Sequence, residues 1–188
     1  MLVSRRSGHR GDDPENVDPV HFARRILPWF DAALRGWVAL PIVVRASVPL
    51  AVMALLWWSS SQEAPLQPHG LPRALLHNSM HVFAYAALGG SLLLAFVRAP
   101  LAMAPSRLAL LGSFVLSCAY GIVDELHQAW VPGRVCSVAD LASDALGCAL
   151  ALTMLTCRLR PGRRGLVALG LCAAGCVVSV ALATFIPW

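Results

Sequence analysis

Residues 165–186 read GLVALGLCAAGCVVSVALATFI, a run of 22 residues without a charged side chain. A helix needs about 20 apolar residues to cross the roughly 30 Å of hydrocarbon in a bilayer. This run therefore predicts a membrane-spanning helix. Four more apolar runs precede it in the chain, at residues 42–60, 79–97, 107–127 and 138–157. We expect an all-α fold, a polytopic membrane helix bundle of about five transmembrane helices.

The composition of the whole chain supports a membrane fold. Hydrophobic residues make up 57% and charged residues 13% of its 188 residues, whereas a soluble domain carries about 45–50% and about 25%. So little charge leaves too little polar surface to cover a water-soluble globule. A soluble enzyme is disfavoured, and the dispersed arginines, which form no basic stripe, exclude nucleic acid as a partner. The expected partner is the lipid bilayer.

The runs divide the chain into four parts. Residues 1–20 are polar and have the composition of a disordered tail. Residues 21–41 place apolar and aromatic side chains at helical spacing between arginines, which is typical of an amphipathic segment lying in the membrane interface. Residues 42–157 are expected to form a four-helix membrane unit. The run at 165–186 is then an additional C-terminal transmembrane helix.

The loops on the two sides of the predicted bundle differ in positive charge. The side opposite the N-terminus holds only Arg73 and Arg134. The N-terminal side holds all the other loop arginines, namely Arg24, Arg25, Arg35, Arg45, Arg98, Arg107, Arg158, Arg160, Arg163 and Arg164. Because arginine-rich loops stay in the cytoplasm, we expect a multi-pass protein of the cell membrane with a cytoplasmic N-terminus and an extracytoplasmic C-terminus.

Polar side chains interrupt three of the runs at the end predicted to face outward. A carboxylate at the bilayer centre costs about 2.5–3.5 kcal/mol on insertion scales, so such groups must pair, sit shallowly or line a wet cavity. The three runs bring them to one depth at one face, which predicts a shared, outward-opening pocket. Its candidate residues are His81, Tyr85, Asp124, Glu125, His127, Gln128, Arg134, Asp140 and Asp144.

Helical spacing indicates which of these side chains share a face. His81 and Tyr85 are four apart, and Asp124 is followed by His127 and Gln128 at three and four residues. Arg134 closes the loop Val-Pro-Gly-Arg at 131–134 and is the one cation within easy reach of the acids. We therefore expect its guanidinium to pair with their carboxylates.

The motifs themselves resemble the VanZ-like family over roughly residues 45–157. The resemblance is carried by His-Val-Phe-Ala-Tyr-Ala-Ala-Leu-Gly at 81–89, by Tyr-Gly-Ile-Val-Asp-Glu-Leu-His-Gln-Ala-Trp-Val-Pro-Gly-Arg at 120–134, and by the two acids at 140 and 144. It implies a bacterial integral membrane protein of the cell envelope; the founding member is associated with reduced susceptibility to teicoplanin. Family members usually carry a charged residue and a Lys where this chain has His77 and Asn78.

Three functions remain open at this point. In the first, the pocket binds a lipid-linked or glycopeptide envelope molecule, with no cofactor, no metal and no assigned catalytic residue. In the second, a metal-dependent hydrolase or transferase acts on a lipid-linked substrate, with nitrogen and oxygen ligands suited to Zn²⁺ or Mn²⁺. In the third, the polar network only joins helices. The ligands that the second function would use are His81, Glu125, His127, Asp140 and Asp144.

Overall fold

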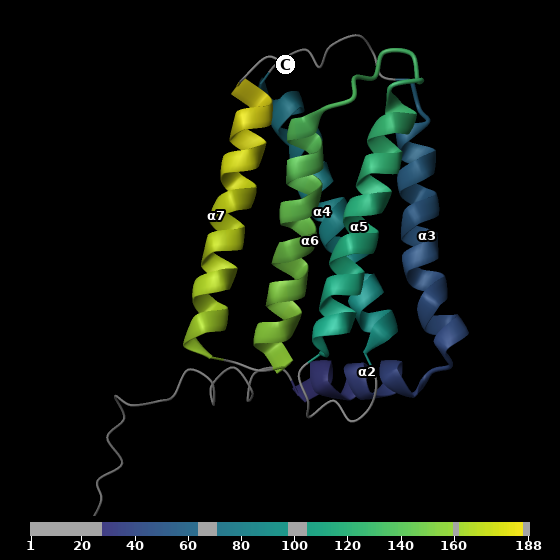
Figure 1. The fold of residues 1–188 in the computed structure, drawn as a ribbon, viewed down its shortest axis with the longest axis vertical. Coiled ribbons are helices and arrows are strands. Elements are labelled where there is room, and N and C mark those ends of the chain that lie inside the picture. The colour runs from purple at the N-terminus through teal and green to yellow at the C-terminus, as the bar shows by residue number, and fades with distance from the viewer. Residues whose placement is uncertain (1–27, 64–70, 98–104, 160–161, 186–188) are drawn as a thin grey trace, which may run out of the picture.

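The computed structural model is helical throughout the elements it describes, which lie within residues 28–63, 71–97, 105–159 and 162–185. Five helices are long and apolar enough to cross a membrane, and they stand side by side along the long axis of the molecule (Figure 1). No strand occurs in these ranges. The all-α fold with five transmembrane helices is confirmed. The helices are α2 (Pro28–Ala39), α3 (Ile42–Ser60), α4 (Leu71–Phe96), α5 (Arg107–Gln128), α6 (Val138–Leu159) and α7 (Arg163–Phe185).

The start of α4 differs most from the prediction. The helix begins at Leu71, and its membrane-spanning part begins at Ala74, whereas the apolar run predicted a start at residue 79. The polar residue Asn78 does not end the helix, because its side chain is buried in the bundle. Its Nδ2 donates a hydrogen bond of 2.9 Å to Oγ1 of Thr184 on α7. A partner on a neighbouring helix thus allows α4 to extend through a polar position.

The outer surface of the bundle is apolar. Leu108 on α5 is 80% exposed, and Leu171 and Val177 on α7 are 69% and 70% exposed. In water such a surface would drive association. In a bilayer the hydrocarbon chains solvate it, and the backbone polar groups are satisfied within each helix.

Helix α4 is the centre of the bundle and packs against α3, α5, α6 and α7. Its closest approach is to α6, where Gly89 lies against Cys148 and Gly147 lies against the backbone of Val82. Small residues at such crossings let membrane helices pack by van der Waals contact. This contact fixes the relative position of two helices that together carry four of the nine predicted pocket residues.

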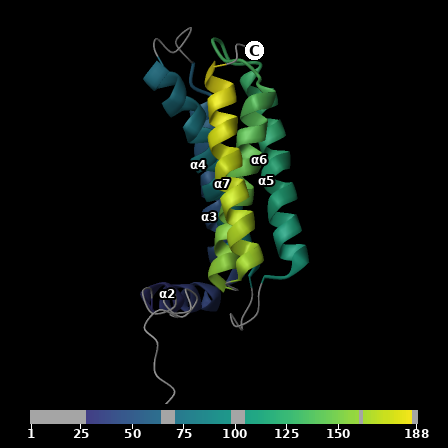
Figure 2. The same ribbon diagram turned by 90° about the vertical axis from the view of Figure 1, so that its left-hand side faces the viewer.

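Helix α2 lies across one end of the bundle, roughly at right angles to the other helices (Figures 1 and 2). It is anchored by Leu34, which is buried, and by Trp37, whose Nε1 donates to the carbonyl of Leu94 over 3.0 Å. This helix occupies the middle of the predicted interfacial segment 21–41. The interfacial location stays a prediction, and residues 1–27, with the predicted tail, lie outside the described residues.

Two arginines satisfy the carbonyl groups at helix ends. Arg45, on α3, is buried and donates from Nη1 to the carbonyl of Val97, directly after α4 ends. At the opposite end of the bundle, Arg134 donates to the carbonyls of Ser59 and Gln62, where α3 ends. The last carbonyls of a helix have no partner within it and carry partial negative charge, so a guanidinium stabilises both ends.

Candidate functional site

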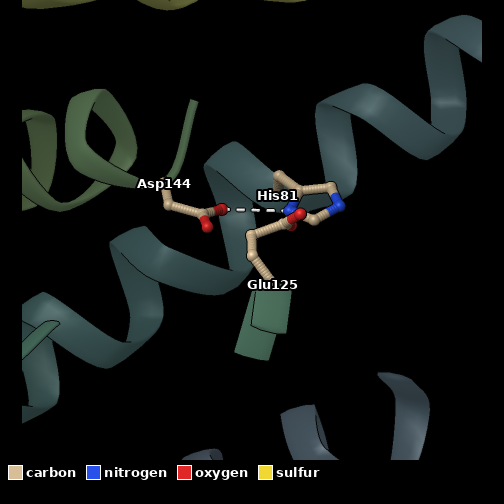
Figure 3. Close-up of side chains that lie close together, drawn as sticks. All are labelled: His81, Glu125 and Asp144. Atoms are coloured by element: carbon tan, nitrogen blue, oxygen red, sulfur yellow. Dashed lines mark hydrogen bonds and ion pairs between the residues drawn. The ribbon is translucent and has the colours of Figure 1, made fainter. Parts of the chain in front are cut away.

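Three helices bring polar side chains together at the end of the bundle opposite α2. His81 lies on α4, Glu125 on α5 and Asp144 on α6, and Figure 3 shows these side chains pointing toward one another. One nitrogen of the histidine and one oxygen of each carboxylate all lie within 4.8 Å of one another. We call these three residues, together with Tyr85, the polar cluster.

His81 lies between two aspartates of α6. Its Nδ1 forms a hydrogen bond of 3.0 Å with Oδ1 of Asp144, and its Nε2 lies 4.0 Å from Oδ2 of Asp140. Because Asp140 and Asp144 are one helical turn apart, both face the same histidine. Electrostatic attraction between an imidazolium and these carboxylates offsets part of the cost of burying them.

Tyr85 lies one turn further into the bundle on the same face of α4 and is 1% exposed. A Cβ atom added to Gly121 of α5 would lie 3.3 Å from Cε1 of Tyr85 and 3.2 Å from Oδ2 of Asp144. The absence of a side chain at Gly121 therefore lets the ring and the carboxylate meet against α5. The hydroxyl of Tyr85 is within electrostatic range of Asp144, Asp124 and Glu125.

Glu125 connects the cluster to the first turn of α6. Its Oε2 accepts a hydrogen bond of 2.7 Å from the backbone N–H of Ser137. Ser137 is the N-cap of α6, since its Oγ accepts from the backbone N–H of Asp140 over 3.2 Å. The positive end of the helix dipole thus faces the carboxyl groups of Glu125 and Asp140.

Four buried oxygen atoms in this region have no hydrogen-bond partner among the described residues. Each belongs to a side chain whose residue is at most 3% exposed. A buried polar atom without a partner costs about 1–3 kcal/mol, so the contacts among the described residues leave this cost unbalanced at one place in the bundle. The atoms are the hydroxyl of Tyr85, Oδ1 of Asp124, Oε1 of Glu125 and Oδ2 of Asp144.

Asp124 and Gln128 form a pair on the same face of α5. Nε2 of Gln128 donates to Oδ2 of Asp124 over 3.1 Å, and both residues are buried. This agrees with the prediction that their spacing places them on one face. The remaining member of the predicted face, His127, lies elsewhere.

His127 contacts α3 and not the polar cluster. Its ring stacks on Trp57 with ring centroids 3.9 Å apart, and its Nε2 is 3.0 Å from Oγ of Ser61. The helical angle between Asp124 and His127 is about 60°, which is enough to turn one toward the interior and the other toward α3. Of the five metal ligands considered from the sequence, His127 is therefore not near the other four.

The expected pairing of Arg134 with the acids is wrong. Its Nε and Nη2 donate to the carbonyls of Gln62 and Ser59, over 3.1 and 2.9 Å, and among the described residues it forms no ion pair with a carboxylate. The preceding turn directs it away, because Gly133 has a φ of 78° and the N–H of Arg134 donates to the carbonyl of Val131. Pro132 followed by a glycine with positive φ is the arrangement of a type II turn.

Several contacts of the site were not predicted from the sequence. The N-cap at Ser137 had a detectable signal, since Ser137 precedes Asp140 by three residues just before an apolar run. Trp57 and Ser61, which hold His127, gave no such signal, because stacking and hydrogen bonding between helices depend on their relative rotation.

A family model described as VanZ/LLP1 matches residues 33–159. The chain belongs to this family. The match includes all nine predicted pocket residues and ends with α6. No curated protein and no solved structure matches the chain.

In this VanZ-family protein, α7 lies beyond the matched residues and packs on α6 and α4. Ser179 of α7 is 2.6 Å from Ser143 of α6, hydroxyl to hydroxyl, and Thr184 of α7 accepts from Asn78. Asn78 is the position at which the resemblance described above leads us to expect a Lys. Its side chain contacts the additional helix through Thr184.

Proposed function

We propose that this VanZ-family membrane protein binds the polar part of a cell-envelope molecule through the polar cluster and Asp124. The observation that carries the proposal is the set of four buried, unpartnered oxygen atoms on Tyr85, Asp124, Glu125 and Asp144. Three of them are carboxylate oxygens, which accept hydrogen bonds when ionised. A ligand that donates through hydroxyl groups or an amine satisfies them, as a lipid-linked sugar or a glycopeptide does.

The proposal places the cluster on the extracytoplasmic side. Three arginines that border the predicted arginine-rich loops lie at the end of the bundle that carries α2, and such loops stay in the cytoplasm. These arginines are Arg107 at the start of α5, Arg158 near the end of α6 and Arg163 at the start of α7. The cluster lies at the other end, beside the 129–137 loop. The N-terminus is then cytoplasmic, the C-terminus extracytoplasmic, and the phenotype we propose is resistance to a glycopeptide of the teicoplanin type.

Arg134 has a different role from the one its charge suggests. Because its guanidinium is occupied by the carbonyls of Ser59 and Gln62, it joins the 129–137 loop to the end of α3. We assign it to positioning this loop beside the cluster. Loss of Arg134 then weakens function through the position of the loop and of Glu125, which the loop holds through Ser137.

The test is the teicoplanin susceptibility of a bacterial strain with and without the protein, compared with single variants at equal membrane abundance. We expect Glu125→Gln and Asp144→Asn to abolish any protection, because each replaces an unpartnered carboxylate oxygen. His127→Gln is the matched control, since it changes a histidine at the same end that faces α3. No difference between strains with and without the protein refutes the resistance phenotype.

The same variants distinguish binding from a purely structural network. If the network only joins helices, each cluster variant lowers the amount of folded protein together with the phenotype. Folded but inactive Glu125→Gln protein supports binding. Equal binding of a fluorescent glycopeptide or lipid-linked precursor by the wild type and Glu125→Gln proteins contradicts the proposal.

A further inference from the structure

We propose that His81, Glu125 and Asp144 together bind one divalent transition metal ion, with Zn²⁺ as the first choice. Each residue comes from a different helix, and one donor atom from each lies within 4.8 Å of the other two. Figure 3 shows the two carboxyl groups and the imidazole converging on one point. Five ligands were considered from the sequence. His127 is not among the three proposed here, because it lies against α3.

The donor atoms match the chemistry of such an ion. One imidazole nitrogen and two carboxylate oxygens suit Zn²⁺ or Mn²⁺, whereas Mg²⁺ and Ca²⁺ prefer oxygen ligands alone. In tetrahedral coordination, ligands about 2.1 Å from one ion lie about 3.4 Å from each other. The observed limit of 4.8 Å therefore requires the most widely separated donor atoms to approach by at most about 1.4 Å, shared between two side chains.

The second line of evidence is the unpartnered atoms around these ligands. Oε1 of Glu125 and Oδ2 of Asp144 are buried without a hydrogen bond among the described residues, and the hydroxyl of Tyr85 beside them is also free of one. Coordination to a cation satisfies carboxylate oxygens of this kind. The cation also offsets negative charge, since three carboxylates, those of Glu125, Asp140 and Asp144, face a single histidine.

The surroundings hold the proposed ligands as a metal site requires. The carboxylate of Asp140 faces Nε2 of His81 at 4.0 Å, within ion-pair distance, while Nδ1 faces the ion. The backbone N–H of Ser137 holds the other oxygen of Glu125 over 2.7 Å. Metal-binding histidines and carboxylates commonly have their second polar atom fixed in this manner.

The inference rests on the proposed function in one respect, that the polar cluster is a ligand site. An ion with three protein ligands retains an open position, which an oxygen or nitrogen atom of the envelope molecule can occupy. The metal is the partner that the inference adds. Binding of the metal alone can be measured without any envelope molecule.

The experiment uses the full-length protein in detergent, stripped with a chelator and then dialysed against Zn²⁺, Mn²⁺, Mg²⁺ or Ca²⁺ separately. Metal per chain is measured by mass spectrometry and the melting temperature by circular dichroism. We expect about one Zn²⁺ per chain, a melting temperature that increases with Zn²⁺ concentration, and no retention of Mg²⁺ or Ca²⁺. Glu125→Gln, Asp144→Asn and His81→Gln should each lower the Zn²⁺ affinity at least tenfold, while His127→Gln leaves it unchanged.

Size-exclusion profiles and helical content show whether each variant is folded. Folded wild-type protein that retains no Zn²⁺ or Mn²⁺ and shows no shift of melting temperature overturns the inference. Retention of metal by all three cluster variants overturns the assignment of the ligands. If the protein retains no metal but still protects a strain from teicoplanin, the inference fails and the proposed function stands. If the protein binds metal but protects no strain, the inference stands and the proposed resistance phenotype fails.

Discussion

Gly147 lies at the crossing of α4 and α6 and is the position where a single methyl group should perturb the bundle most. A Cβ atom there would overlap the carbonyl oxygen of Val82 and lie 2.9 Å from its C and Cα atoms. Carbon atoms pack at about 3.5–4.0 Å. The helices must therefore separate locally by about 0.6–1.1 Å, since a backbone obstacle cannot rotate aside as a side chain can.

The cost of Gly147→Ala follows from this separation. A gap of 0.5–1 Å forfeits about a quarter to a half of each dispersion contact, and overpacking substitutions cost about 1–3 kcal/mol. The rigid obstacle places this variant at about 2–3 kcal/mol. For a chain of this size that lowers the melting temperature by about 4–12 °C. The separation also lengthens the contact between His81 and Asp144, which are neighbours of Val82 and Gly147 on the same two helices.

Thermal unfolding in detergent, followed by circular dichroism, measures this effect. Gly112→Ala is the matched control, because nothing lies within 4 Å of a Cβ added to Gly112, and alanine favours the helix by up to about 1 kcal/mol. We expect the control to be neutral or slightly stabilised. If the two variants melt at the same temperature, α4 and α6 do not approach as closely as the structure indicates, and the reasoning is refuted.

Three further predictions concern the loop and α7. Arg134→Ala should lower the free energy of unfolding by about 1 kcal/mol through loss of the bonds that cap α3; full stability of this variant in thermal unfolding would contradict the capping role. A double-mutant cycle with Asn78→Ala and Thr184→Ala should give a coupling of about 0.6 kcal/mol, and additive effects would exclude the bond. A membrane-impermeant maleimide should label Cys136, which is exposed in the 129–137 loop, in intact cells; labelling only after lysis would place the cluster in the cytoplasm. Because desolvation and the nearby Glu125 carboxylate raise the pKa of the Cys136 thiol, its labelling rate should still rise above about pH 8.5, the ordinary thiol pKa.

The membrane fold could be predicted closely from the sequence because it depends on the summed hydrophobicity of consecutive residues. Whether a run such as 107–127 crosses a bilayer depends on the transfer energies of its own residues. The prediction failed by several residues at the start of α4, where Asn78 is polar yet buried. Its partner Thr184 lies on α7, and no local pattern in the sequence of α4 indicates this hydrogen bond.

The candidate site was predicted in part. Spacing correctly placed Asp124 and Gln128 on one face, and the clustering of acids at matching run ends predicted that His81, Glu125 and Asp144 would be close. Spacing cannot give the rotation of each helix about its axis, which depends on all of its neighbours. Helical spacing therefore grouped His127 with Asp124, although one faces α3 and the other the interior.

Arg134 shows the limit of reasoning from charge. Its proximity in sequence to the carboxylates of α5 and α6 favoured an ion pair, but the chain turns at Gly133 and the guanidinium meets the carbonyl groups that end α3. Those carbonyls lack an α-helical partner four residues on only because α3 stops there, and they are near Arg134 only because α3 packs beside α5. The positions of the hydrophobic runs alone thus account for the five helices and for the polar residues lying at one end of them. The partner of each polar atom depends on distances of a few ångströms between helices, because hydrogen bonds and ion pairs, unlike transfer into lipid, require a specific geometry.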